Sequence, residues 1–412
     1  MSATPAALDQ HTMNWRHWAA VIICMLLNAL DGFDVLSISF AAPAISKDWL
    51  LAPSALGWLL SMELIGMGVG SVLLGGVADK LGRKQTILGC LLAMTAGMYG
   101  ASHAADMQTL LSWRLVAGFG IGGMLASINA LTSEVSNARW RSLSMALMVL
   151  GYPLGGVVGG LAISPLMATG NWRGIFMYGA VASAILVPVV LALIPDTRQA
   201  AAAHLAASNA RVTDIFRKGL LTTTLVLALA YVGHITSFYF VLKWVPKLVV
   251  DMGFTPKAAG GVLTITNVGS VIGCLAFGLV AARLSVKTVS QIAMLGTAAT
   301  IIVFGQGHAT LGQLQMVVVV AGFFINSAVT GMYTLFTTEF PPHLRATGTG
   351  FCIGIGRGGA ALAPILAGYL LQAGLKLPTV AVVMCCGSLI GAALLYFLPK
   401  RAGTSLATHT RD

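Results

Sequence analysis

Charged residues are scarce in this sequence. Only 9% of the 412 residues are Asp, Glu, Lys or Arg, whereas 57% are hydrophobic. A soluble domain carries about 25% charged residues on average. The scarcity of charge excludes an ordinary soluble protein and predicts an integral membrane protein, because lipid can solvate an apolar surface.

The sequence also lacks the residue patterns of metal and catalytic sites. Its six cysteines all fall within apolar segments, and none has a His partner at metal-ligand spacing. We find no set of nucleophile, base and orienting group, so we expect no enzyme, no metal and no cofactor. The net charge of +11 comes from short gaps between apolar runs and forms no basic face, so we expect no nucleic-acid partner.

Long apolar runs make up most of the chain. Runs of about 20 residues predict membrane-spanning helices. We count twelve: 18–42, 54–77, 85–104, 109–131, 142–165, 172–194, 219–245, 257–282, 286–305, 312–335, 346–371 and 378–398. The polar stretch between the sixth and seventh predicts a six-helix bundle over 1–194, a cytoplasmic linker over 195–218, a second bundle over 219–400 and a cytoplasmic tail over 401–412.

The distribution of Lys and Arg predicts the orientation. Sixteen of the 24 lie in segments on the same side as the termini, six lie in segments on the other side, and two lie within spans. Lys243 and Lys247 are counted among the six. Because cytoplasmic loops are enriched in Lys and Arg, both termini should be cytoplasmic.

The two halves of the sequence repeat. "GGVADKLGRK" at 75–84 aligns without gaps to "GLVAARLSVK" at 278–287. Likewise "SEVSNARWR" corresponds to "TEFPPHLR" when a one-residue shift is allowed. Parallel repeats of six spans are one architecture of secondary transporters. We therefore predict an all-α membrane protein with twelve transmembrane helices in two pseudo-symmetric six-helix bundles.

The loop "GGVADKLGRK" matches G-x-x-x-D-[RK]-x-G-R-[RK] at all six specified positions. This motif resembles the loop signature between spans two and three of the major facilitator superfamily. The resemblance implies the major facilitator fold and a loop that stabilises one conformation of a transport cycle. The second copy has Ala282 and Ser285 in place of the Asp and Gly, so it should be weaker. The residues that we assign to this conformational latch are Gly75, Asp79, Gly82, Arg83, Lys84, Arg114, Glu134, Glu339 and Arg345.

Two glycine clusters, "GFGIGG" at 118–123 and "GIGRGG" at 354–359, formally match a dinucleotide-binding pattern. That pattern requires a strand before it and a βαβ unit around it, and neither cluster has them. Both lie within predicted spans, where small residues let helices approach closely. We interpret them as helix-packing faces.

Five charged residues lie inside predicted spans: Asp31, Asp34, Glu63, Arg114 and Arg357. Each costs about 2.5–3.5 kcal/mol at a helix centre, so a function is the default hypothesis. The alternative is static ion pairs that only hold helices together. Depths along the helices, at about 1.5 Å per residue, predict that Asp31 lies level with Arg357 and Asp34 level with Arg114. Two nearby carboxylates raise each other's affinity for protons, so Asp31, Asp34 and Glu63 are our predicted proton-coupling residues.

Several other polar residues could face a cavity between the halves. His234 could bind substrate or relay a proton, although a buried His is more often simply hydrogen-bonded. Lys243, beside the aromatic residues Phe238, Tyr239 and Trp244, fits either an interfacial belt with a snorkelling lysine or a stacking wall with a cation for a planar anion. The remaining predicted substrate contacts are Asn129, Tyr152, Asn267, Asn326 and Tyr333.

A narrower resemblance rests on "LDGFD", "KWVPKLVVDMGFTPKAAG" and "GRGGAALAP". With the loop motif, these segments resemble the aromatic acid:proton symporter family within the superfamily. That family implies import of a small aromatic carboxylate, or a related organic acid anion such as muconate, with protons across the bacterial inner membrane. It implies roles for Asp31 and Asp34 in transport and for Arg357 in binding the substrate carboxylate. The lysines of "KWVPK" would favour a dianion.

The transport class leaves one alternative open, a proton-coupled exporter of drugs or metabolites. Such exporters usually carry Gly-Pro in the fifth span, and here Tyr152 precedes Pro153. We expect a monomer whose partners are an organic acid anion, protons and lipid.

Overall fold

The structure is a computed structural model that describes residues 12–137, 139–194, 212–217, 219–307, 310–341 and 344–399. Within these ranges the side chains of 75–80, 142, 212 and 346 are not described. The predicted linker and tail lie largely outside the described residues.

Twelve helices of 20 residues or more form the described part of the chain. The N-terminal half contains α2 (Trp15–Asp48), α3 (Pro53–Leu81), α4 (Arg83–Ser102), α5 (Met107–Val135), α6 (Arg141–Ala162) and α8 (Trp172–Leu193). The C-terminal half contains α10 (Leu221–Asp251), α11 (Pro256–Ala281), α12 (Val286–Gly305), α13 (Leu311–Glu339), α14 (Arg345–Gln372) and α15 (Leu377–Tyr396). The short helices α7 (Ser164–Thr169) and η1 (Val212–Phe216) complete the described elements.

The predicted twelve spans are confirmed as helices, with one instructive difference in length. The first and seventh helices continue past Pro43 and Pro246 to Asp48 and Asp251, because each proline is accommodated inside its helix. The sequence prediction ended the seventh span at residue 245. It was therefore wrong to count Lys243 among the residues of an outer loop.

Eleven of the twelve helices are apolar enough over 18 residues to be recognised as spans by composition. The exception is α4, whose polar residues and glycines lower its hydropathy. It runs between α3 and α5, both of which are long enough to cross a membrane, so α4 must cross as well.

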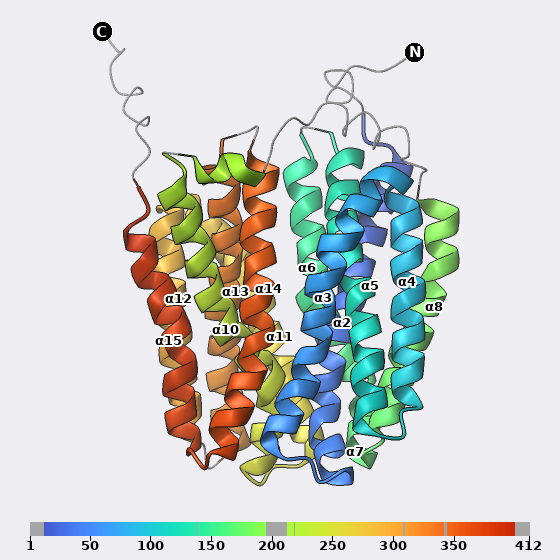
Figure 1. Cartoon of the computed structure of the whole chain (residues 1–412), viewed down its shortest axis with the longest axis vertical. Coiled ribbons are helices and arrows are strands. Elements are labelled where there is room, and N and C mark those ends of the chain that lie inside the picture. The colour runs from blue at the N-terminus through green and yellow to red at the C-terminus, as the bar shows by residue number, and fades with distance from the viewer. Residues whose placement is uncertain are drawn as a thin grey trace.

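Each half of the chain packs as a six-helix bundle. Figure 1 shows the two bundles side by side, with both chain ends at the same face of the molecule. Inside the first bundle α2 packs on α6, and α3 and α4 pack on α5. The second bundle repeats this arrangement, with α10 on α14 and α11 and α12 on α13. The bundles meet where α3 contacts α14, α6 contacts α11 and α2 contacts α10.

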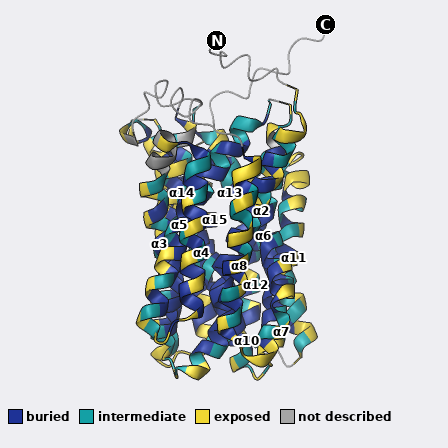
Figure 2. Ribbon diagram, turned by 90° about the vertical axis from the view of Figure 1, so that its right-hand side faces the viewer, coloured by how far each residue is buried: buried dark blue, intermediate teal, exposed yellow. Residues whose placement is uncertain are grey.

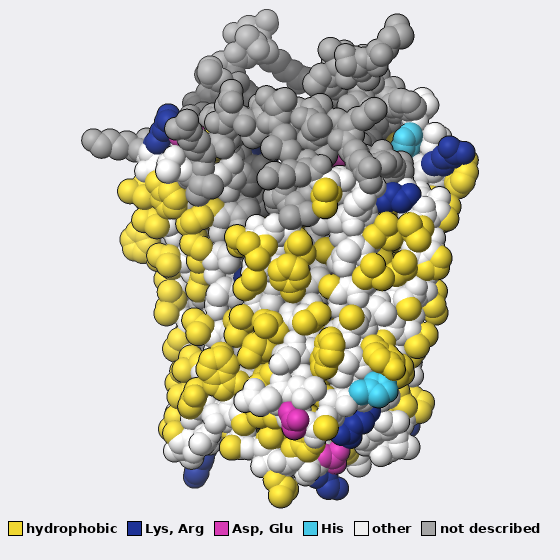
Figure 3. Space-filling model, turned by 45° about the vertical axis from the view of Figure 1, so that its right-hand side comes forward, with side chains coloured by type: hydrophobic (Ala, Val, Ile, Leu, Met, Phe, Trp, Pro, Cys, Tyr) yellow, Lys and Arg dark blue, Asp and Glu magenta, His cyan; other side chains and the backbone are white. Residues whose placement is uncertain are grey.

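The outer surface suits lipid rather than water. Large apolar side chains such as Val72, Leu161 and Leu279 are exposed, and buried residues line the helix faces that point inward (Figure 2). On the face drawn in Figure 3, hydrophobic side chains cover the middle of the molecule while charged side chains gather towards its two ends. This distribution is the one expected for helices that span a bilayer.

Glycines set the distance between α3 and α5, as predicted for "GFGIGG". A Cβ at Gly118 would overlap the carbonyl of Glu63, and one at Gly122 would overlap the carbonyl of Met67. The close approach of these helices brings the side chain of Arg114 within reach of α3. In the second cluster Gly356 packs against the Tyr231 ring in the same way.

Candidate functional site: buried charges between the bundles

Arg114 joins two carboxylates inside the first bundle. Its Nη1 lies 2.8 Å from Asp34 Oδ1, and its Nη2 forms an ion pair with Glu63. The guanidinium also donates to the main-chain oxygen of Asp34, at 3.0 Å. All three side chains are fully buried. The predicted pairing of Asp34 with Arg114 is therefore present, and the bond to Glu63 adds a third helix to it.

Lys243 reaches this group of charges from the second bundle. Its ammonium lies 3.1 Å from Glu63 Oε2 and also donates to the main-chain oxygen of Val35. The side chain has no exposed surface, so the interpretation of Lys243 as a snorkelling interfacial lysine was wrong. Lys243 instead ties α10 to α2 and α3 in the interior.

Arg357 also crosses between the bundles, but its partner is a main-chain group. Its Nη1 donates to the carbonyl oxygen of Met67 on α3, at 2.8 Å. No carboxylate of a described residue lies within ion-pair distance of this guanidinium. Asp31, which we predicted to lie level with Arg357, therefore forms no ion pair with it in this conformation.

Asp31 stands apart from the other buried acids. Its side chain is 1% exposed, and neither carboxylate oxygen accepts a hydrogen bond from a described residue. Among the charged groups around it, Arg357 exerts the largest electrostatic effect. Gly32, the next residue, packs against the carbonyl of Tyr152, so α2 meets α6 at this level. Asp31 is thus a desolvated carboxylate with a cation near it but not bonded to it, an arrangement that can bind a proton.

Both ring nitrogens of His234 have hydrogen-bond partners within the second bundle. Its Nδ1 lies 3.0 Å from the hydroxyl oxygen of Ser388, and its Nε2 lies 3.0 Å from the carbonyl oxygen of Ile325. The ring is completely buried. It joins α10, α13 and α15, and this geometry favours the structural interpretation over a direct role in substrate binding.

The predicted aromatic wall is divided between two environments. Tyr239 on α10 and Tyr152 on α6 lie near each other across the bundle interface, and the Tyr152 hydroxyl is buried without a hydrogen-bond partner among the described residues. Trp244 is 1% exposed, and its indole nitrogen donates to the carbonyl oxygen of Pro364, at 3.2 Å. Tyr239 and Tyr152 therefore remain candidates for contact with substrate, whereas Trp244 mainly fixes α10 against α14.

The remaining polar candidates bond within their own bundles. Asn129 and Asn267 donate to the carbonyl oxygens of residues one turn earlier on their own helices. Asn326 donates to the hydroxyl of Ser270, at 2.6 Å, and the Tyr333 hydroxyl lies 3.3 Å from that of Tyr231. Of these four, Asn267 lies at the bundle interface, where its amide touches Gly156 of α6.

Several residues of the predicted latch form contacts in the first half. Arg83 Nε lies 3.1 Å from Glu134 Oε1, and Lys84 donates to the carbonyl oxygen of Leu191, at 2.8 Å. Gly82 has a φ of 97°, which a residue with a side chain would rarely adopt. The side chain of Asp79 lies outside the described part of the structure, and nothing is described of Gly75 beyond its place in α3.

The second half retains only part of this latch. Lys287 donates to carbonyl oxygens at the end of α15, as Lys84 does at the end of α8. Among described residues, Glu339 and Arg345 form no ion pair with each other or with another side chain. The prediction of a weaker second latch, which rests on Ala282 and Ser285, stays a prediction.

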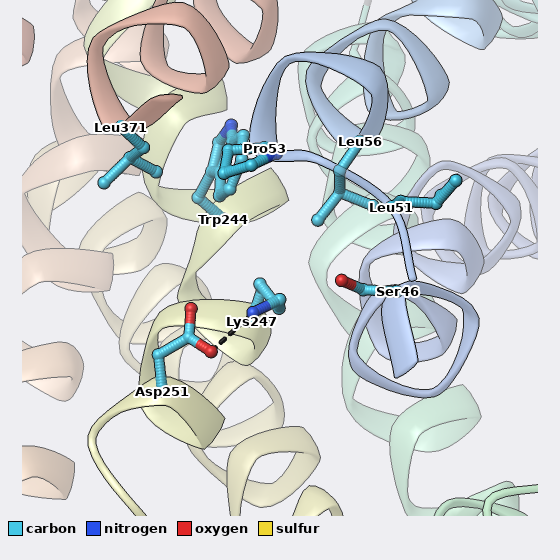
Figure 4. Close-up of a pocket in the computed structure, with 8 residues that line it drawn as sticks. All are labelled: Ser46, Leu51, Pro53, Leu56, Trp244, Lys247, Asp251 and Leu371. Carbon is cyan, nitrogen blue, oxygen red and sulfur yellow. Dashed lines mark hydrogen bonds and ion pairs between the residues drawn. The ribbon is translucent and has the colours of Figure 1, made fainter. Parts of the chain in front are cut away.

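A pocket of about 210 Å³ opens between the bundles at the face opposite the termini. Figure 4 shows its walls, with Lys247 paired to Asp251 on α10 and with Trp244 above them in the view. Its other lining residues are Ser46, Leu51, Pro53, Leu56 and Leu371. Lys247 follows Lys243 by one helical turn, so the pocket ends near the buried charges.

Sequence reasoning missed the bonds of Glu63 to Arg114 and Lys243. The signal was present: a helix that continues through Pro246 places Lys243 well inside the span rather than at its end. The main-chain carbonyls of Val35 and Met67, which accept from Lys243 and Arg357, could not be predicted as acceptors from the sequence, because every residue carries a carbonyl.

Comparisons with known proteins agree with this architecture. The sequence model of a family described as the Major Facilitator Superfamily matches residues 24–284 and 227–412. The chain is 30% identical to the 3-(3-hydroxy-phenyl)propionate transporter of Escherichia coli (strain K12), covering 92% of this chain and 93% of that protein. It is 27% identical to the gallate transporter of Pseudomonas putida, covering 90% and 89%. The crystal structure of a D-xylose-proton symporter superposes with a TM-score of 0.75 at 16% identity, covering 93% and 98%.

Proposed function

Because the chain belongs to the Major Facilitator Superfamily and is a secondary transporter, we propose that it imports a small aromatic carboxylate together with protons. The observation that carries this proposal concerns Asp31 and Arg357. Among the described residues, Asp31 is a buried carboxylate without a hydrogen-bond partner, and Arg357 is a guanidinium that donates only to a main-chain carbonyl. They belong to different bundles, so their separation changes when the bundles rock.

In the proposed cycle Arg357 binds the substrate carboxylate and Asp31 binds the proton. Tyr152 and Tyr239, which lie near each other across the bundle interface, would flank the aromatic ring. Transport of hydroxylated aromatic acids by the two curated relatives supports a substrate of this class. The ion pairs of Asp34 and Glu63 would hold the helices that position Asp31.

We place the protein in a bacterial inner membrane as a monomer, with both termini in the cytoplasm. The excess of Lys and Arg on the side of the termini supports this orientation. The contacts of Lys243 with Glu63, of Ser54 with Gln372 and of Trp58 with Tyr369 all lie between mid-membrane and the opposite face. In this orientation they join the two bundles on the outward side.

Uptake of radiolabelled benzoate, hydroxybenzoates, protocatechuate and muconate tests the proposal. Cells that produce the protein should accumulate at least one aromatic acid, and an uncoupler should abolish the accumulation. Accumulation that persists after the proton gradient has collapsed would contradict proton coupling. Export of a preloaded acid against its gradient would contradict import.

A further inference from the structure

The charges in the interior can be counted. Among the described residues, six charged side chains lie near mid-membrane, of which five are buried and one, Arg357, is half-buried: Asp31, Asp34, Glu63, Arg114, Lys243 and Arg357. Three are acids and three are bases, so the interior is neutral when all six are ionised. Neutrality matters because an uncompensated charge in the membrane interior is costly.

Four of these charges already compensate one another. Arg114 bridges Asp34 and Glu63, and Lys243 binds Glu63 from the other bundle. This closed group contains two acids and two bases. Lys247, one turn further out, is also paired, with Asp251. Neither lysine is therefore left to bind a second carboxylate of a substrate.

The remaining two charges, Asp31 and Arg357, form no ion pair with a described residue. One proton on Asp31 removes one negative charge, and one carboxylate on Arg357 supplies one. The loaded interior is then neutral, as is the empty one. A second proton would leave it positive, and a substrate with two ionised carboxylates would leave it negative.

We infer that the transporter carries one proton with each monocarboxylate, so that neither the loaded nor the empty carrier moves net charge across the membrane. This inference rests on the proposed function. The proton binds a carboxylate oxygen of Asp31 and is released on the cytoplasmic side with the substrate, and no covalent bond of the substrate changes. The inference replaces the expectation that the lysines of "KWVPK" favour a dianion.

The surroundings of Asp31 are consistent with a single proton site. The charged and titratable groups that act on it from its own and the neighbouring helices are Asp34, Glu63, Lys243, Arg357, Tyr152 and Tyr239. Asp34 and Glu63 both hold bonded cations. Asp31 is the acid of the three with no such cation, and so it gains most from a proton.

The stoichiometry can be measured with the full-length protein in liposomes, with radiolabelled 3,4-dihydroxybenzoate as the probe. A pH gradient alone should give about tenfold accumulation per pH unit, the ratio for one proton per monoanion. An inside-negative potential, set with potassium and valinomycin, should leave this ratio unchanged. Protein-free liposomes measure passive entry of the protonated acid, which has the same signature and must be subtracted.

The alternative outcomes separate the inference from the proposed function. Accumulation of about a hundredfold per pH unit, increased by an inside-negative potential, would mean two protons and would overturn the inference while leaving symport intact. Protein-dependent uptake that ignores the pH gradient would overturn the proposed function itself.

Substrate charge gives an independent test. The dianion of muconate should compete with the probe at least about tenfold less well than benzoate, because only Arg357 is left to bind a carboxylate. The matched variant Lys247→Gln removes a cation from the outer pocket but leaves Asp31 and Arg357 unchanged. It should therefore keep both the tenfold accumulation per pH unit and the preference for benzoate over muconate. Stronger competition by the dianion that is lost in Lys247→Gln would contradict the charge count.

Discussion

Equivalent positions of the two bundles differ in their hydrogen bonding. The register that aligns Gly75–Lys84 with Gly278–Lys287 also aligns Pro43 with Pro246 and Asp31 with His234. His234 bonds to Ser388 and Ile325, whereas Asp31 accepts no hydrogen bond from a described residue. In the second bundle the residue at this position holds helices together. In the first bundle it is a group that can change its charge.

The contrast extends to the other charges near mid-membrane. The first bundle supplies all three acids, and the second supplies Lys243 and Arg357, both of which reach across to the first. The two bundles therefore attract each other electrostatically. Changes at Asp31 should affect coupling, and changes at His234 should affect stability.

The largest effect is expected from Asp31→Asn. Without an ionisable group at this position, accumulation driven by a pH gradient should fall to the level of protein-free liposomes. Exchange of labelled for unlabelled substrate should persist, because it requires no net movement of protons. Full gradient-driven accumulation by a folded Asp31→Asn variant would show that this acid is structural.

Arg114→Met should be the most damaging change to stability. It leaves Asp34 without a cation and Glu63 with Lys243 alone, and breaking a buried ion pair costs about 3–5 kcal/mol. Thermal unfolding of the purified protein in detergent measures the loss. The double variant Arg114→Met/Asp34→Asn removes the stranded charge and should recover much of the stability. If the double variant is no more stable than the single one, charge compensation is not the cause.

His234→Leu should destabilise the second bundle without affecting coupling. It leaves the Ser388 hydroxyl and the Ile325 carbonyl with one partner fewer, which costs about 1–3 kcal/mol. His234→Gln can restore one of the two bonds and should lie between Leu and the natural residue. A His234→Gln variant that is as stable as the natural protein but has lost its pH dependence would instead place this residue in the proton path.

The smallest effect is expected at a pair of equivalent helix starts. Asp106 caps α5 by accepting from the backbone nitrogen of Thr109, at 2.8 Å, while Thr310 caps α13 with an uncharged hydroxyl. The bond from Thr109 lowers the pKa of Asp106 below its ordinary value of 3.8. The ionised cap therefore stabilises the fold above that value, and this contribution is lost as the pH falls through the lowered pKa.

Asp106→Thr makes the first cap resemble the second. It should lower the unfolding temperature slightly at neutral pH, and the difference should shrink as the pH falls below 3.8. Unfolding curves at neutral and at acidic pH measure it. A difference that grows as the pH falls would contradict stabilisation by the ionised carboxylate.

Much of the fold could be predicted because each membrane span must be apolar over a fixed length. Depth along the helices was enough to pair Asp34 with Arg114, since both belong to one bundle. It was not enough for Asp31 and Arg357, because their separation depends on how the two bundles are positioned. Lys243 was misplaced because Pro246 was taken as the end of a helix, although a proline within a membrane helix is often accommodated.

The bond between Arg357 and Met67 has a consequence for how the protein can evolve. Its acceptor is a main-chain oxygen, which no substitution of the Met67 side chain can delete. Selection can therefore alter this contact mainly through the arginine or through the path of the helix that carries the carbonyl. Suppressors of a poorly closing variant should accordingly map to the glycines that hold α3 against α5, such as Gly122, and leave residue 67 itself free to vary.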